Sequence, residues 1–155
     1  MGPFIPATTL YSLARTMSKT ARRLAFPLLS DSRGSLSFGQ FDAHLPFPPR
    51  RYFVVFDVPA GEARGNHAHR ASHQVYVCLR GNVQVTVDDG RDREEVLLEG
   101  PRVGLYVPPM VWSSQHHFSK GAILLVLASD AYDPNDYIRS HEDFLAEVRA
   151  ERGDL

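Results

Sequence analysis

The sequence has little cysteine and almost no net charge. Cys78 is the only cysteine, and 17 basic residues stand against 18 acidic ones, which leaves a formal charge of −1. A lone cysteine excludes an intrachain disulfide, and its apolar neighbours favour a small buried side chain at this position. Balanced charge excludes the strongly basic surface that is typical of nucleic-acid-binding proteins.

Long hydrophobic runs are also absent. No stretch reaches the roughly 18 consecutive apolar residues of a membrane span. The N-terminal segment has no apolar region followed by a small-residue cleavage site, as a secretory signal would have. We therefore expect a cytoplasmic protein that binds neither nucleic acid nor a membrane. We expect residues 1–25 to be a poorly ordered extension and residues 26–155 to form one domain, since 155 residues suit a single domain.

Short runs rich in Val, Tyr, Phe, Leu and Ile alternate with turn residues, which predicts β-strands. These runs are 50–58, 73–81, 82–90, 94–100, 103–109 and 122–130. No helical segment separates them, so the pattern favours an antiparallel sandwich or barrel over a parallel sheet with crossover helices. "GEARGN" contains glycines, but it lacks the strand-to-helix context of a dinucleotide-binding loop.

One helix is predicted, near the C-terminus. We expect it to begin at Asp133 or Asn135, which are good capping residues. Helical spacing then brings Ile138, Leu145 and Val148 close to one face. This face predicts packing against the outside of the β-structure.

Three of the seven histidines, His67, His69 and His73, fall within seven positions. If the segment is extended, His67 and His69 lie side by side on one face and Ala68 points away. Such a cluster is open to three interpretations: metal binding, proton transfer or packing. Three imidazoles with an open position suit zinc or ferrous iron.

The histidine spacing, within a predicted small β-barrel, resembles the cupin pattern. In metal-binding cupins the third ligand is usually Glu, where this chain has His73, and the fourth is His, where this chain has Ser113. A metal-dependent cupin enzyme using His67, His69 and His73 is therefore one alternative. A non-catalytic cupin that binds sugar nucleotides is another.

A more specific resemblance covers most of the chain. The segments that carry it are "DSRGSL" (31–36), "ARGNHAHR" (63–70), "QVYVCLRGNVQVTVDDG" (74–90), "VGLYVPPMVW" (103–112) and "LVLASDAYDPNDYIRSHEDFL" (125–145). They resemble the WxcM-like family of sugar 3,4-ketoisomerases, cupin enzymes that act on dTDP-4-keto-6-deoxyglucose in amino-deoxysugar synthesis. The resemblance implies an all-β double-stranded β-helix (a jelly-roll barrel) with a C-terminal α-helix. It also implies a homodimer that exchanges N-terminal strands and needs no metal or other cofactor.

The implied reaction suits the histidine pair. Moving a ketone from C4 to C3 requires a base and an acid beside adjacent carbons, and imidazole serves in both directions at neutral pH. By resemblance, His67 and His69 are the catalytic residues. His69 is the favoured carbon base and His67 the group that moves the proton between the sugar oxygens, although the order is open to reversal.

The resemblance and the chemistry of the side chains suggest further substrate-binding residues. Arginines suit the diphosphate, and aromatic side chains suit the base and the sugar. The candidates are Arg33, Tyr52, Arg64, His73, Tyr106, Trp112, Ser113 and His116. Ser113 and His73 depart from the relatives, which leaves open the gluco or galacto configuration of the product and the choice of dTDP or UDP.

Overall fold

The computed structural model describes residues 21–154. The strands are β1 Arg22–Ala25, β2 Leu28–Asp31, β3 Gly34–Ser37, β4 Arg51–Val55, β5 Arg64–His69, β6 Gln74–Arg80, β7 Asn82–Asp88, β8 Arg93–Glu99, β9 Val103–Val107, β10 Trp112–His116, β11 Ile123–Ala128 and β12 Tyr137–Ile138. A 3₁₀ turn, η3, spans Pro134–Asp136, and one α-helix, α1, spans His141–Arg152. No helix of the described part of the chain is long and apolar enough to cross a membrane.

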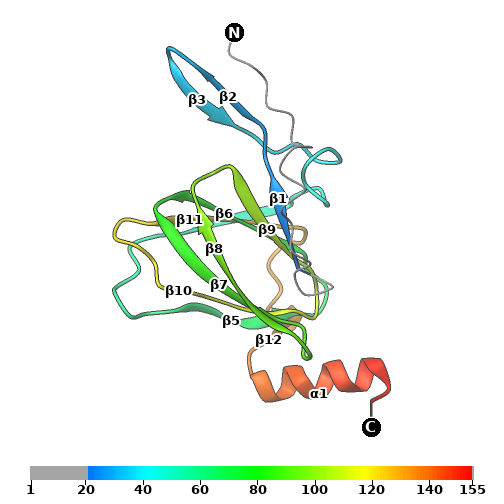
Figure 1. Cartoon of the computed structure of the whole chain (residues 1–155). Helices are drawn as coiled ribbons and strands as arrows, with labels where there is room; N and C mark the ends of the chain where they lie inside the picture. Colours follow the sequence, from blue (N-terminus) through cyan, green and yellow to red (C-terminus); the bar gives the residue numbers. More distant parts are fainter. Residues whose placement is uncertain (1–20, 155) are drawn as a thin grey trace.

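Two five-stranded sheets form the body of the molecule (Figure 1). The first has the order β1-β9-β6-β11-β4 and the second the order β12-β5-β10-β7-β8, while β2 and β3 form a separate hairpin. The named strands pair antiparallel. The predicted antiparallel β-structure with a C-terminal helix is therefore confirmed. Strand β1 lies within the segment expected to be an extension, and it pairs with β9.

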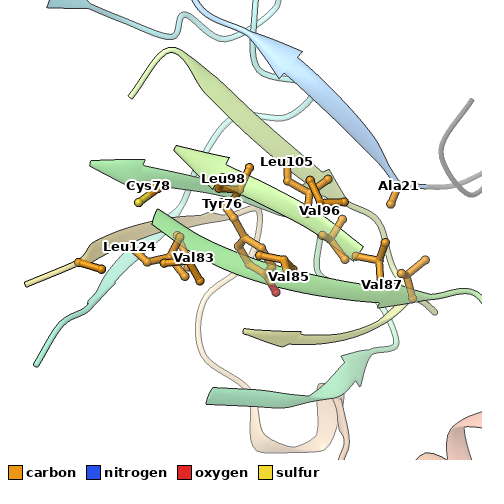
Figure 2. Close-up of a cluster of buried hydrophobic side chains, with 14 residues drawn as sticks. Ala21, Tyr76, Cys78, Val83, Val85, Val87, Val96, Leu98, Leu105 and Leu124 are labelled. Carbon is orange, nitrogen blue, oxygen red and sulfur yellow. The ribbon is translucent and has the colours of Figure 1, made fainter. Parts of the chain in front are cut away.

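The main core lies between the two sheets (Figure 2). Alternate residues of β7, Val83, Val85 and Val87, are fully buried there, because side chains of a strand point to opposite faces in turn. Tyr76 and Cys78 of β6 enter the same core from the first sheet. The same alternation turns Val75 and Val77 of β6 outward, to a second cluster on the opposite face of the first sheet.

The predicted start of the helix is wrong. Asp133 caps the short turn η3, whereas α1 begins at His141 with Ser140 as its cap. Between them, Ile138 pairs with Ala68 of β5, so the chain stays extended where a helix was expected. Because pairing with β5 satisfies the backbone there, the sheet overrides the helical spacing of the sequence.

The helix packs outside the second sheet, as expected (Figure 1). Phe144 and Val148 are buried with Ile138 against Ala68, which belongs to the strand that carries the histidine pair. Leu145 is partly buried at the same cluster. The helix therefore fixes β5 from its outer face.

Candidate active site

A bulge in β5 directs the site residues inward. Gly65 and Asn66 both have positive φ angles, 78° and 58°, and the register with β10 shifts at this point. Arg64 pairs with Gln115 and His67 pairs with Ser113, two residues of β10 that share one face. The extra residue therefore lets Arg64 and His67 face the same side although they are three positions apart.

The two histidines lie together, as the strand spacing predicts. The ring centroids of His67 and His69 are 4.9 Å apart. Ala68 points the other way, into the cluster with α1. The Tyr137 ring lies 4.9 Å from that of His67 and 4.4 Å from that of His69, so three rings meet at one point.

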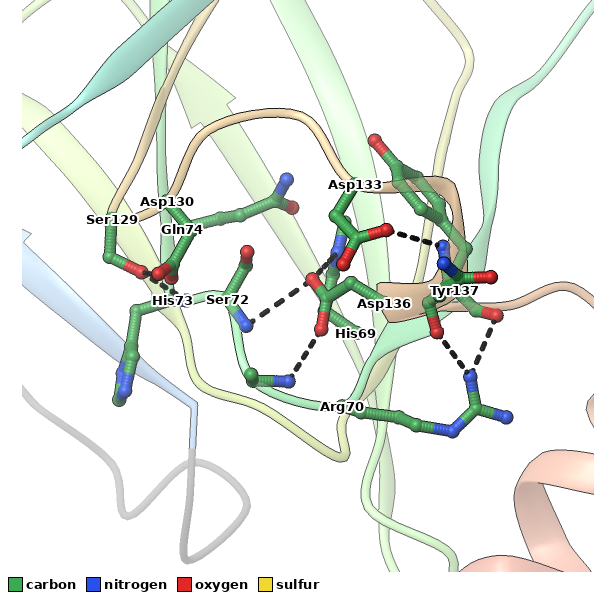
Figure 3. A network of polar contacts seen from close by, with 12 residues as sticks. His69, Arg70, Ser72, His73, Gln74, Ser129, Asp130, Asp133, Asp136 and Tyr137 are labelled. Atoms are coloured by element: carbon green, nitrogen blue, oxygen red, sulfur yellow. Dashed lines mark hydrogen bonds and ion pairs between the residues drawn. The ribbon is translucent and has the colours of Figure 1, made fainter.

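Asp136 holds His69 in one orientation (Figure 3). Its Oδ2 lies 2.8 Å from Nδ1 of His69, and the carboxylate also accepts hydrogen bonds from the backbone N–H groups of Ala71 (2.7 Å) and Ser72 (3.3 Å). A carboxylate that accepts from Nδ1–H leaves the lone pair of a neutral imidazole on Nε2. Nε2 of His69 is buried and has no partner among the described residues. The geometry is that of an oriented base.

Arg70 fastens the segment that carries Asp136. Its guanidinium donates to the backbone carbonyls of Asn135 (2.9 Å) and Tyr137 (3.1 Å), on either side of Asp136 (Figure 3). The same group forms a bidentate ion pair with Glu147 of α1, at 2.6 and 3.0 Å. These contacts link α1 to the segment that carries Asp136, and the bidentate pairing fixes the orientation of the Arg70 guanidinium.

Both histidines favour the neutral form. Burial lowers the pKa of His67 to about 4, with a further contribution from the neighbouring His69. Burial also lowers the pKa of His69, although the Asp136 hydrogen bond opposes this effect. Burial acts to raise the pKa of Asp136, but its hydrogen bonds outweigh this and hold the pKa below the usual value. At neutral pH the site therefore contains two neutral imidazoles and a carboxylate.

A cavity of about 660 Å³ opens beside these rings. Its polar lining consists of Arg51, Asp57, Glu62, Arg64, His67, Gln74, Tyr76, Gln115 and Tyr137. Phe53 and Val55 of β4 form part of its apolar wall. A hollow of this size, in which polar groups converge beside an apolar wall, is typical of small-molecule sites.

Four of the predicted site residues lie at or beside the cavity. Arg64 and His67 line it. Ser113 is buried directly across from His67, and its hydroxyl lies 2.8 Å from that of Tyr76, which also lines the cavity. His69 lies next to His67.

His73 does not join the other two histidines. Its Nδ1 lies 2.7 Å from the hydroxyl of Tyr106, and its ring packs near Phe47 on the outer face of the first sheet. Figure 3 shows its side chain directed away from Asp136. The alternative metal site of His67, His69 and His73 is therefore not assembled, and residues 21–154 contain no group of three or more His, Cys, Asp and Glu side chains suited to a metal ion.

The remaining candidates also lie away from the cavity lining. Arg33 pairs with Asp31 in the β2–β3 hairpin at 2.6 Å, and Tyr52 is 70% exposed. Trp112 packs against two rings of α1. His116 contacts Thr86 on the outer face of the second sheet. Within this chain none of these four side chains forms part of the cavity lining.

Sequence reasoning missed several residues that the fold brings to the site. These are Arg51, Gln74, Tyr76, Gln115, Asp136 and Tyr137. Gln74 and Tyr76 belong to the segment 74–90, and Asp136 and Tyr137 to the segment 125–145; both segments resemble the family, but the resemblance gave these residues no role. No local pattern marks Arg51 or Gln115, because their inward direction depends on strand parity and pairing.

The low pKa of His67 predicts a stability effect in mild acid. The unfolded chain binds a proton at His67 below about pH 6.5, and the folded chain only near pH 4, so acidification through this interval favours unfolding. We expect the wild type to lose about 1–2 kcal/mol more of its unfolding free energy than His67→Asn between pH 7 and pH 5. Urea unfolding of both proteins at the two pH values measures this. Equal losses would contradict the burial of a neutral His67.

Gly65 is needed for close packing against Gln115 as well as for its positive φ. A Cβ at this position would lie 2.7–2.8 Å from the side-chain amide of Gln115, and φ is positive. We expect Gly65→Ala to cost about 1–3 kcal/mol of stability and to displace Gln115. Gly61→Ala is the matched control, because Gly61 has a similar φ of 84° and open space around it. Thermal unfolding of the two variants measures the difference, and equal destabilisation would show that the Gln115 contact costs nothing.

The sequence is similar to a family of known proteins and to one of its characterised members. Residues 19–149 match the family model described as WxcM-like, C-terminal. The TDP-4-oxo-6-deoxy-alpha-D-glucose-3,4-oxoisomerase of Aneurinibacillus thermoaerophilus is 43% identical over 130 residues, which are 82% of this chain and 94% of the relative.

Solved structures agree with the family match. QdtA, a sugar 3,4-ketoisomerase of Thermoanaerobacterium thermosaccharolyticum solved in complex with TDP, superposes with a TM-score of 0.83 at 32% identity, over 87% of this chain and 98% of QdtA. A mutant of QdtA was solved in complex with TDP-4-keto-6-deoxyglucose. A 3,4-ketoisomerase of Helicobacter canadensis gives a TM-score of 0.80 at 36% identity, over 83% of this chain and 97% of that one.

Proposed function

The chain belongs to the WxcM-like family and is an isomerase, and from this premise we propose that it converts dTDP-4-keto-6-deoxyglucose to the corresponding 3-keto sugar. One observation carries the proposal: a neutral histidine pair, with His69 oriented by Asp136, stands beside a cavity of ligand size. Proton transfer between adjacent carbons needs a base and an acid beside them, and the histidine pair can serve as both.

The reaction is an internal exchange of hydrogen. A base removes the proton on C3, which the C4 carbonyl acidifies, and the electrons form an enediol between C3 and C4. The O3 proton passes to O4, and a proton is delivered to C4, which leaves a ketone at C3 and a hydroxyl at C4. The substrate and the product are isomers, so no oxidant or reductant is consumed.

We assign the carbon base to His69 and the oxygen-to-oxygen proton transfer to His67. The Asp136 contact supports this order, because it leaves Nε2 of His69 as the proton acceptor. The position of His67 on the cavity wall supports its contact with the sugar oxygens. Tyr137, in contact with both rings, limits their rotation.

Two arginines of the cavity suit the diphosphate of the substrate. Arg64 was predicted for this role, and Arg51 joins it on the lining. A guanidinium binds phosphate oxygens in a bidentate manner and stays charged at all relevant pH values. The roles of Arg33, Tyr52, His73, Tyr106, Trp112 and His116 in binding remain predictions.

Conversion of the substrate tests the proposal. The purified protein is incubated with dTDP-4-keto-6-deoxyglucose, and ¹³C NMR follows the position of the ketone. We expect the C4 ketone signal to fall and a C3 ketone signal to appear, with or without EDTA. No new ketone would contradict the isomerase activity on this substrate, and loss of activity with EDTA would favour the metal-dependent alternative. The same spectra give the configuration at C4.

We further propose a cytoplasmic homodimer in which N-terminal strands are exchanged, with residues 26–155 as the main domain. Exposed apolar side chains support the contact: Leu29 and Leu36 on the β2–β3 hairpin are 46% and 56% exposed, and Tyr52 stands on the edge strand β4. Figure 1 shows the hairpin projecting from the two sheets. Exposed apolar surface of this kind is typical of interfaces. Light scattering after size-exclusion chromatography tests it, and a monomer at micromolar concentration would contradict it.

A further inference from the structure

Three buried side-chain nitrogens lack a hydrogen-bond partner among the described residues: Nε of Arg51, Nε2 of His69 and Nε2 of Gln74. Arg51 and Gln74 line the cavity, and His69 adjoins it. Leaving a buried polar group unpaired is unfavourable, because the group loses its hydrogen bonds to water and gains none in return. Three such atoms at one cavity indicate a place that is built for the polar groups of a ligand.

Gln74 and Arg51 stand in one row of the first sheet. Both pair with Ala128 of β11, Gln74 from one side and Arg51 from the other. Residues in one row of an antiparallel sheet point to the same face. Both side chains therefore point to the face of the first sheet that the cavity adjoins.

A chain of hydrogen bonds fixes the amide of Gln74. The Tyr76 hydroxyl donates to Oε1 of Gln74 at 2.7 Å, which uses its single proton. Ser113 must then donate to the Tyr76 oxygen, 2.8 Å away, and Ser113 accepts from Nε2 of Gln115 at 3.4 Å. Burial raises the pKa of Tyr76 to about 12, so this donor keeps its proton. Oε1 is therefore occupied, and the amide N–H groups of Gln74 remain free.

We infer that Gln74 is a further catalytic residue, whose amide nitrogen donates a hydrogen bond to the sugar oxygen that becomes negative as the enediol forms. The inference rests on the proposed function. Removal of the C3 proton places charge on the carbonyl oxygen at C4, and a fixed donor stabilises that charge more than it stabilises the ketone. Tyr76, Ser113 and Gln115 are positioning residues for this donor.

Gln74→Met tests the assignment, since methionine has a similar length and no donor. We expect kcat for ketone transfer to fall about 10²–10³-fold, while KM and the affinity for TDP change by less than about threefold. Tyr76→Phe keeps the Gln74 amide but removes the hydrogen bond that orients it, so this variant should lose less kcat than Gln74→Met. Gln84→Met, on the outer face of the second sheet, is the matched control and should retain full activity.

The outcomes separate this inference from the proposed function. A wild type without ketone transfer contradicts the proposed function itself. An active wild type together with a folded Gln74→Met protein of unchanged kcat contradicts the role of Gln74, as does a loss that appears in TDP affinity rather than in kcat. Gln74→Met leaves the Tyr76 hydroxyl without its acceptor, which could unfold the protein. In that case the double variant Gln74→Met, Tyr76→Phe removes the hydroxyl as well. The kcat of the double variant is then compared with that of Tyr76→Phe alone.

Discussion

Replacing His69 by asparagine is expected to lower kcat about 10²–10⁴-fold, the range that a positioned general base contributes. Asparagine keeps an N–H that can donate to Asp136, but it has no basic nitrogen in the place of Nε2. His69 contacts Asp136 at 2.8 Å. Asparagine can keep this contact, so the substitution preserves the local packing. Steady-state kinetics with dTDP-4-keto-6-deoxyglucose measures the effect.

A matched control separates the loss of a base from the loss of any histidine. His141→Asn changes a residue of α1 that pairs with Asp88 at 3.0 Å, away from the cavity. We expect its kcat to stay within about twofold of the wild type. A His69→Asn protein with unchanged kcat would contradict the assignment of the carbon base to His69.

Asp136→Asn is expected to reduce kcat about 10²–10⁴-fold, because the carboxylate fixes the tautomer of His69 and stabilises the imidazolium that forms. Asp136 accepts hydrogen bonds from Ala71, Ser72 and His69. In asparagine an NH₂ group replaces one of the accepting oxygens and faces these donors. A stability loss of about 1–3 kcal/mol should accompany the change.

The pH profile distinguishes this role from a purely structural one. The carboxylate of Asp136 raises the pKa of His69 against the effect of burial, so its removal lowers that pKa further. The acidic limb of kcat/KM should therefore move to lower pH in Asp136→Asn. Asp133→Asn is the control, because Asp133 only caps η3 and asparagine caps equally well. An unshifted acidic limb in Asp136→Asn would contradict its electrostatic action on His69.

Local sequence patterns predicted the strands whose formation depends on neighbouring residues in the sequence. Alternation in β7 and in the segment of His67 and His69 indicated strands with one buried face, and pairing in the sheets bears this out. Strand β10, "WSSQH", was not predicted, because its inward residues, Ser113 and Gln115, are polar and give no hydrophobic alternation.

The rest of the site depends on contacts between segments that are distant in the sequence. Asp136 lies 67 positions from His69, and nothing near either residue indicates that they meet. The bulge at Gly65 and Asn66 changes strand parity, so simple alternation places Arg64 on the wrong face. His73 was grouped with His67 and His69 by spacing, but the turn between β5 and β6 places it on the opposite face of the first sheet.

Hydrogen exchange at carbon is the most direct test of proton transfer by the histidine pair. The protein is incubated with dTDP-4-keto-6-deoxyglucose in D₂O, and NMR follows deuterium at C3 and C4. We predict deuterium at these carbons with the wild type, and incorporation at no more than about one hundredth of that rate with His69→Asn. A wild type that moves no ketone and incorporates no deuterium, or an equal rate in His69→Asn, would contradict this prediction.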